Sequence, residues 1–226
     1  MSDARGVTVQ KTVLRNDEDD FRDVRLGYGG ELIGIPWMQA LALEGRMFGV
    51  AYGAANNTIA TVGTFAPGAV ALDEFDLLQT VPATVAVMPA YYKVAFSTVG
   101  TVAALHVALA WGQTGVIAAG ISCTPFNLNT GSTNASLCTI TGLGDDGGTA
   151  CTISGVIYQE AATVLVGAAN TPQQLGYEWA AGKAGFVPVI KGLVSPTRQV
   201  MGWAAAQGGT GWITYQYAEL PIDAIE

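Results

Sequence analysis

A glycine-rich loop and a few neighbouring carboxylates are the features of this chain whose residue types and spacing could do chemistry. Residues 142–147 read GLGDDG and fit the G-x-G-x-x-G pattern of a dinucleotide-binding loop. Such a loop follows a strand and opens a helix, whose amino terminus holds the pyrophosphate. Here the next residues, 149–158, are rich in β-branched side chains and predict a strand. Asp145 and Asp146 also stand where phosphates would approach, so the segment predicts a turn and no nucleotide site.

Carboxylates offer a second kind of chemistry. Asp73 and Asp76 lie in the segment LDEFD, while Asp145 and Asp146 lie in the glycine-rich loop. Oxygen-rich loops bind calcium, and paired carboxylates hydrolyse glycosides. Neither function requires a specific sequence, so the presence of these aspartates is weak evidence for either. The four aspartates are therefore weak calcium candidates. We predict no cofactor.

Histidine and cysteine chemistry has little support in the sequence. His106, the one histidine, stands among alanines in a predicted strand, where a structural role is expected. No serine lies in a G-x-S-x-G segment. Cys123, Cys138 and Cys151 are too scattered for a zinc site. The sequence therefore predicts a protein that is not an enzyme.

The glycine-rich loop has a different interpretation as the tip of a β-hairpin. Two near copies, SLCTIT and TACTIS, flank it, and its glycines supply the positive φ angles that a short connection needs. One register of this hairpin places Cys138 directly opposite Cys151, so that a cross-strand disulfide can form. A tight turn at residues 146–147 instead places Cys151 opposite Gly142. Both registers remain open, and reduced thiols are favoured in a protein made in the cytoplasm.

The composition favours a β-sheet protein with extensive neutral surface. Of the 226 residues, 50% are hydrophobic and only 12% are charged. That charged fraction is about half of the roughly 25% that is typical of soluble domains. Lys93 is the only charged residue between Leu77 and Gly144. Because large uncharged patches usually mark interfaces, we expect the chain to associate with itself.

The distribution of charge argues against nucleic-acid binding. The net charge is −8, whereas contact with phosphates needs clustered lysine and arginine. Residues 1–30 carry mixed charges and end in the flexible GYGG, which predicts an N-terminal arm. No apolar core segment opens the chain, so we expect synthesis in the cytoplasm.

Alternation of large and small side chains predicts strands over much of residues 31–226, the expected single domain. In VAALHVALAW, residues 102–111, large side chains alternate with alanine and histidine. This period of two indicates a strand with one face in a core, although residues 102–121 are long and neutral enough to span a membrane. We expect the strand to turn at residues 112–115 and to return as residues 116–121.

Prolines mark two expected helices and one interrupted strand. Pro36 suits the first turn of a helix, and Thr171, Pro172 and Gln174 give the capping-box pattern of a second one. Pro89 interrupts the alternating segment ATVAVMPAYYKVAF and predicts a bulge or an edge there. About ten strands separated by turns predict an all-β sandwich or barrel.

The order of these elements is similar to that of a known class of proteins. A short helix leads into the first core strand at ALEGRMFGVAY, a neutral run of strands follows through VPATVAVMPAYYKVAF, and a segment with a helix comes late. From about Glu31 onward, the chain resembles single jelly-roll capsid proteins of icosahedral viruses, of the kind found in tailless phages and uncultured environmental viruses. The resemblance implies an all-β, jelly-roll-like antiparallel β-sandwich with one or two short helices and an N-terminal arm.

The same resemblance implies a structural function, a viral major capsid subunit that assembles into the shell of a virion. The chain itself is then the main partner, beside other virion proteins. The basic arm of many small RNA-virus coats is absent, so we expect no direct nucleic-acid binding. One alternative is another phage structural protein, such as a tail-tube, decoration or fibre-head protein. Another is a carbohydrate- or calcium-binding β-sandwich module that uses the aspartate loops and an exposed Trp203 or Trp212.

Overall fold

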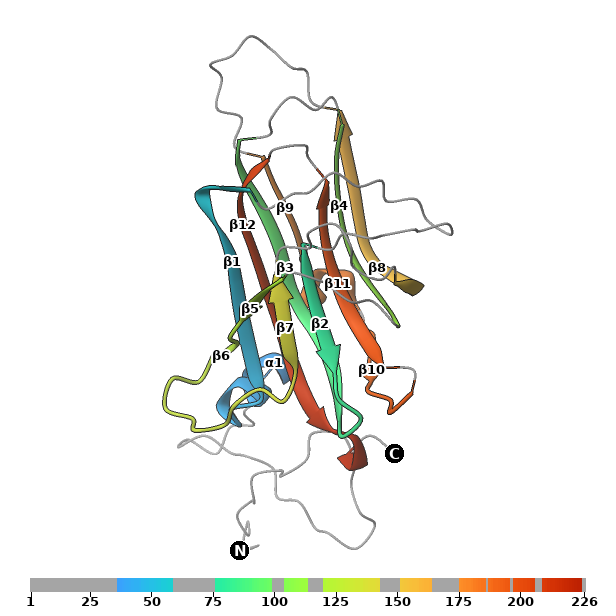
Figure 1. The fold of residues 1–226 in the computed structure, drawn as a ribbon. Coiled ribbons are helices and arrows are strands. Elements are labelled where there is room, and N and C mark those ends of the chain that lie inside the picture. Colours follow the sequence, from blue (N-terminus) through green and yellow to red (C-terminus); the bar gives the residue numbers. More distant parts are fainter. Residues whose placement is uncertain are drawn as a thin grey trace, which may run out of the picture.

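The computed structural model describes residues 36–58, 76–98, 104–113, 120–142, 151–163, 175–185, 187–195, 197–205 and 209–224. The N-terminal arm predicted over residues 1–30 lies outside these ranges. The described residues form two antiparallel sheets that pack as a sandwich, with two short helices (Figure 1). The predicted all-β, jelly-roll-like sandwich is confirmed.

Each sheet has six strands. The first sheet has the order β10-β3-β12-β1-β6, with β9 also paired to β3. Its strands are β1 (Met47–Thr58), β3 (Val85–Thr98), β6 (Phe126–Asn127), β9 (Leu175–Ala180), β10 (Ile190–Lys191) and β12 (Thr210–Pro221). The second sheet has the order β5-β7-β2-β11-β4-β8. Its strands are β2 (Leu77–Val81), β4 (Ala104–Gln113), β5 (Ile121–Cys123), β7 (Thr139–Gly142), β8 (Thr152–Thr163) and β11 (Arg198–Ala205).

The eight main strands are nested in pairs. In chain order they are β1, β2, β3, β4, β8, β9, β11 and β12. The first pairs with the eighth, the second with the seventh, the third with the sixth and the fourth with the fifth. These pairs alternate between the two sheets, as happens when one long antiparallel ribbon is wound around a barrel. This is the strand order of a jelly-roll-like sandwich.

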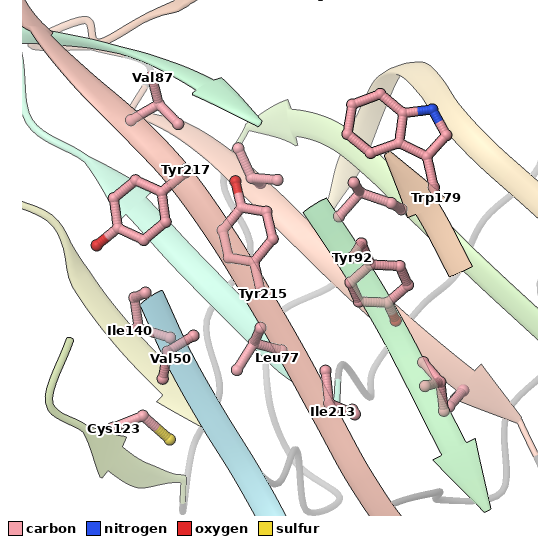
Figure 2. Close-up of a cluster of buried hydrophobic side chains, with 14 of the residues drawn as sticks. Val50, Leu77, Val87, Tyr92, Cys123, Ile140, Trp179, Ile213, Tyr215 and Tyr217 are labelled. Atoms are coloured by element: carbon pink, nitrogen blue, oxygen red, sulfur yellow. The ribbon is translucent and has the colours of Figure 1, made fainter. Parts of the chain in front are cut away.

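The hydrophobic core lies between the sheets, where alternate side chains of both meet. Ile213, Tyr215 and Tyr217 of β12 all point into it and are buried (Figure 2). Leu105 and Leu109 of β4 reach the same core from the second sheet. Burying a large apolar side chain contributes roughly 1.5–3 kcal/mol, so the period of two seen in the sequence determines which faces meet.

The bulge predicted at Pro89 is present. The ladder between β3 and β12 shifts register between Pro89 and Tyr91, which leaves Ala90 as an extra residue. The shift changes the alternation of β3. Val87 points to the core before the bulge and Tyr92 points to it afterwards, so odd residues face inward on one side and even residues on the other.

The first predicted helix is present and the second is mostly absent. Helix α1 (Trp37–Leu43) begins directly after Pro36, and its Leu41 packs on the outer face of the first sheet. Helix α2 (Ala181–Ala184) has only four residues, and the segment before it is strand β9. Burial of Tyr177 and Trp179 in the core overrides the local helix signal. The predicted cap at Thr171 lies outside the described residues. A 3₁₀ turn (Ile222–Ala224) follows β12.

Both predicted hairpins are wrong in their pairing. Strand β7 pairs with β2 and β5, whereas β8 pairs with β4, so SLCTIT and TACTIS are not neighbours. Strand β4 pairs with β11 on one side and with β8 on the other, so the expected return over residues 116–121 does not pair with it. Residues 114–119 themselves lie outside the described ranges. Alternation indicates which face of a strand is buried, but it does not identify the neighbouring strand. The chain instead leaves β4, crosses to the far edge of the second sheet, and comes back to β8.

Candidate assembly surface

Residues 120–142 form an insertion that covers one edge of the sandwich, and we call this segment the edge cap. It lies between main strands β4 and β8 in the sequence. Its strands β7 and β5 extend the second sheet beyond β2, and its strand β6 pairs with β1 of the first sheet at Phe48 and Gly49. The edge cap therefore contacts both sheets on the same side of the sandwich (Figure 1).

Three asparagine side chains attach the edge cap to the end of α1. The amide nitrogen of Asn127 donates to the carbonyl of Gly45 at 2.8 Å. The amide nitrogen of Asn129 donates to the carbonyl of Leu43 at 3.1 Å, and that of Asn134 to the carbonyl of Glu44 at 3.3 Å. The carbonyls at a helix carboxyl terminus have no partner within the helix. The asparagines supply those partners and fix the edge cap in place.

Gly45 makes this contact possible. It has a φ of 69°, and the amide hydrogen bonds from Gly45 to Ala42 and from Arg46 to Leu41 form a Schellman ending. A β-carbon at position 45 would lie 2.2 Å from the Ser132 hydroxyl of the edge cap. Glycine is therefore required both for the helix ending and for the close approach of the loop.

A buried carboxylate attaches the other end of the edge cap. Glu219 of β12 is only 6% exposed and accepts hydrogen bonds from the Ser136 hydroxyl, the Leu137 amide at 3.0 Å and the Cys138 amide at 3.3 Å. The Ser136 hydroxyl also shares a 2.7 Å hydrogen bond with the Tyr217 hydroxyl. Charge-assisted hydrogen bonds of this kind are stronger than neutral ones, so Glu219 is the main polar anchor of this segment.

Tyrosine hydroxyls join the two sheets inside the core. Tyr215 donates to the side-chain oxygen of Gln79 on β2 at 3.0 Å, and Tyr92 donates to the carbonyl of Trp203 on β11 at 3.1 Å. The rings of Tyr215 and Tyr217 stack at 5.2 Å (Figure 2). Burial raises the pKa of all three phenols well above the usual value near 10. These tyrosines stay neutral and hold the sheets together.

Large apolar side chains are exposed on the edge cap and beside it. Leu137 is 61% exposed, Ile121 53% and Phe126 49%, and the nearby Leu43 at the end of α1 is 56% exposed. The edge cap contains no charged residue. A neutral surface with several exposed large apolar side chains is typical of a protein interface. This makes the edge cap the candidate functional surface.

Of the four calcium candidates, the described residues include only Asp76. Asp76 is buried, and its carboxylate accepts a hydrogen bond from the Ala204 amide at 2.6 Å, which links the start of β2 to β11. Asp73, Asp145 and Asp146 lie outside the described residues. Within the ranges that the structure describes, no group of three histidine, cysteine or acidic side chains could hold a metal ion.

The three cysteines are buried and form no disulfide with one another in the described structure. Cys138 belongs to the main core, whereas Cys151 lies in a separate cluster with Met201 and Trp203 on the outer face of the second sheet. The hairpin that would have placed Cys138 opposite Cys151 does not form. Burial, together with the Glu219 carboxylate, raises the pKa of the Cys138 thiol far above its usual value, and burial also raises that of Cys123.

We expect the native thiols to resist modification. At mildly alkaline pH, Cys123 and Cys138 remain protonated and shielded, so Ellman's reagent should react at least about tenfold more slowly with native protein than with urea-unfolded protein. Mass spectrometry of the unfolded sample should find all three cysteines labelled. A fast reaction of the native protein at Cys138 would contradict the observed burial.

Two other predicted positions have roles that their sequence context did not reveal. His106 is half-buried on β4, where its Nε2 lies 3.1 Å from the amide nitrogen of Gln159, and burial lowers its pKa. Trp203 is buried, so the expectation that it is exposed is wrong, whereas Trp212 is 43% exposed. The edge-cap anchors were not predicted. Their only signals are the asparagines of NLNTGSTN and a single acid in the apolar segment YAELP.

Comparison with known proteins finds no relative. No protein-family model, curated protein or solved structure matches the chain significantly. Among the described residues, no helix is long and apolar enough to cross a membrane. Within the neutral segment 102–121, residues 104–113 form strand β4.

Proposed function

We propose that this protein is a structural subunit, a viral major capsid protein that assembles with copies of itself into the shell of a virion. The observation that carries this proposal is the nested strand order of the sandwich combined with its neutral, apolar edge cap. Jelly-roll sandwiches are used in viral capsids as well as in lectins and cupins, so the strand order alone does not select a function. The edge cap and the low charge content favour the shell.

Low charge is expected for a subunit that is surrounded by copies of itself. A closed symmetric assembly covers much of each subunit's surface, and covered surface does not need charge for solubility. The neutral surface favours contacts with protein, including other virion proteins, and the net charge of −8 disfavours a direct contact with nucleic acid.

Electron microscopy tests the proposed function directly. Purified protein at increasing concentration should form closed particles in negative stain, and these should sediment much faster than a 23.3 kDa monomer. Rings, tubes or trimers would instead favour a tail-tube, decoration or fibre-head protein. A monomer that persists at high concentration would contradict self-assembly altogether.

One observation favours a carbohydrate-binding module as the second candidate. Trp212 is exposed on the outer face of the first sheet and lies between Gly53 of β1 and Ala95 of β3 in the ladders. Small neighbours leave an indole face open, and an open aromatic face can stack on a sugar ring. Glycan-array binding that is lost in Trp212→Ala would favour this candidate over the shell.

A further inference from the structure

We propose that the edge cap is a surface through which one copy of this chain contacts a second copy. The inference rests on the proposed function and goes further, because it names the residues that join the subunits. Its central residues are Phe126 and Leu137, together with Leu43 at the end of α1.

The first argument is that the edge cap is already ordered before any partner binds. Much of it is loop, yet asparagine amides fix it to α1 and the Glu219 carboxylate fixes it to β12. Ordering a loop on binding lowers affinity, because the entropy cost is met at that moment. A loop held by its own chain avoids this cost and presents its side chains in one arrangement.

The second argument is the position of the exposed apolar side chains. The ring of Phe126 lies against β1 at Gly49, where a β-carbon would be only 2.8 Å from the ring. One face of the ring is therefore supported by the sheet, while the residue remains 49% exposed. Leu137 donates its amide to Glu219 and is 61% exposed, so the backbone is anchored while the side chain faces solvent. Rigidly supported apolar groups are typical of interface anchors.

The third argument identifies the partner as a second copy. Two chains of net charge −8 repel each other, and they approach with the least repulsion where the surface is neutral. The edge cap contains no charge, and the described carboxylates Glu44 and Glu219 beside it are already engaged. Glu44 pairs with Arg46 at 3.1 Å, and Glu219 is buried among its donors. Within residues 120–142, a nucleic acid or a charged peptide would find no charged group to bind.

A pair of matched lysine variants tests this surface. The double variant Leu43→Lys and Leu137→Lys places charge on it at two solvent-facing side chains. The control, Val156→Lys together with Val194→Lys, adds the same two charges at residues that are 41% and 86% exposed. Val156 lies on β8 and Val194 follows β10, at the edges of the two sheets opposite β5 and β6. In sedimentation velocity over a concentration series, we expect the double variant to associate at least about tenfold more weakly than the wild type. We expect the control double variant to associate as the wild type does.

Hydrogen exchange of the wild-type protein gives a second readout that does not depend on any variant folding. Amides of residues 120–142 should become more protected as protein concentration rises. The proposal is overturned if exchange at the edge cap is independent of concentration while the protein associates, or if a folded double variant associates normally.

These outcomes separate the inference from the proposed function. If the double variant forms closed particles as well as the wild type does, the proposed shell function stands. The edge cap is then rejected as the contact between subunits. Small oligomers that depend on the edge cap but never close would support the edge cap and reject the shell. If the wild-type protein stays monomeric and hydrogen exchange at the edge cap does not change with concentration, both the shell function and the contact between copies are rejected. The partner of the edge cap would then be a different neutral protein.

Discussion

Raising the pH from 10 toward 12 is expected to unfold this protein cooperatively. Seven tyrosines lie in the described residues, and burial is the first cause of a raised pKa for each. For Tyr52, burial and the nearby Asp76 raise the pKa to about 12. In the unfolded chain, phenols ionise near pH 10. The stability that comes from keeping them neutral is thus fully present below pH 10 and is lost as the pH rises through the folded values.

A pH titration that records both tyrosinate absorbance and far-ultraviolet circular dichroism measures this effect. Tyrosinate absorbance should lag behind that of the urea-unfolded protein and then rise in one step, together with the loss of the far-ultraviolet circular dichroism of the sheets. Tyr92, Tyr215 and Tyr217 should ionise only in that step, because their hydroxyls are bonded inside the core. A smooth titration near pH 10 with intact circular dichroism would show that these phenols are accessible in the folded protein.

Replacing Glu219 with alanine is the substitution expected to destabilise the protein most among those discussed here. The change removes the carboxylate that accepts hydrogen bonds from the Ser136 hydroxyl and from the Leu137 and Cys138 amides. The Ser136 hydroxyl keeps its bond to the Tyr217 hydroxyl, and the Cys138 amide keeps its bond to Ser136 Oγ. Because a hydrogen bond to a charged group contributes roughly 1.5–3 kcal/mol, we expect the free energy of unfolding to fall by about 3 kcal/mol. Glu219→Gln keeps one accepting oxygen and should cost less.

Urea unfolding of the three proteins measures this effect, and Glu178→Gln serves as the control. Glu178 is also an acid on a strand, but it is exposed and pairs with Lys183 at the surface. Exposed pairs of this kind contribute little, so its midpoint should stay unchanged. If Glu219→Ala unfolded at the wild-type midpoint, the asparagine contacts alone would be holding the edge cap.

The faces of the strands could be predicted from the sequence, because alternation is a local property. Ile213, Tyr215 and Tyr217 point inward as their spacing predicts, and Pro89 produces the bulge that its missing amide hydrogen requires. Strand neighbours could not be predicted in the same way. SLCTIT and TACTIS are near copies, yet the first lies beside β2 and the second beside β4. Neither segment contains a feature that identifies its neighbouring strand.

Local signals also failed where burial decided the outcome. A capping-box pattern predicted a helix, yet Tyr177 and Trp179 gain more by reaching the core from strand β9. Asp76 belongs to an acidic cluster in the sequence, but its carboxylate is turned inward to the Ala204 amide. The anchors of the edge cap were missed for a similar reason. Asn127 and Asn129 are ordinary turn residues until α1 is placed next to them.

The anchors of the edge cap also set the order in which its surface can mature during synthesis. Asn127 bonds to a residue 82 positions earlier, whereas Cys138 bonds to Glu219, 81 positions later. The hydrogen bonds from the edge cap to Glu219 therefore cannot form until β12 has emerged from the ribosome and has paired. Contacts between such distant positions form late in folding. A partly made chain cannot present the finished surface, so under the proposed self-assembly incomplete subunits could not join through it.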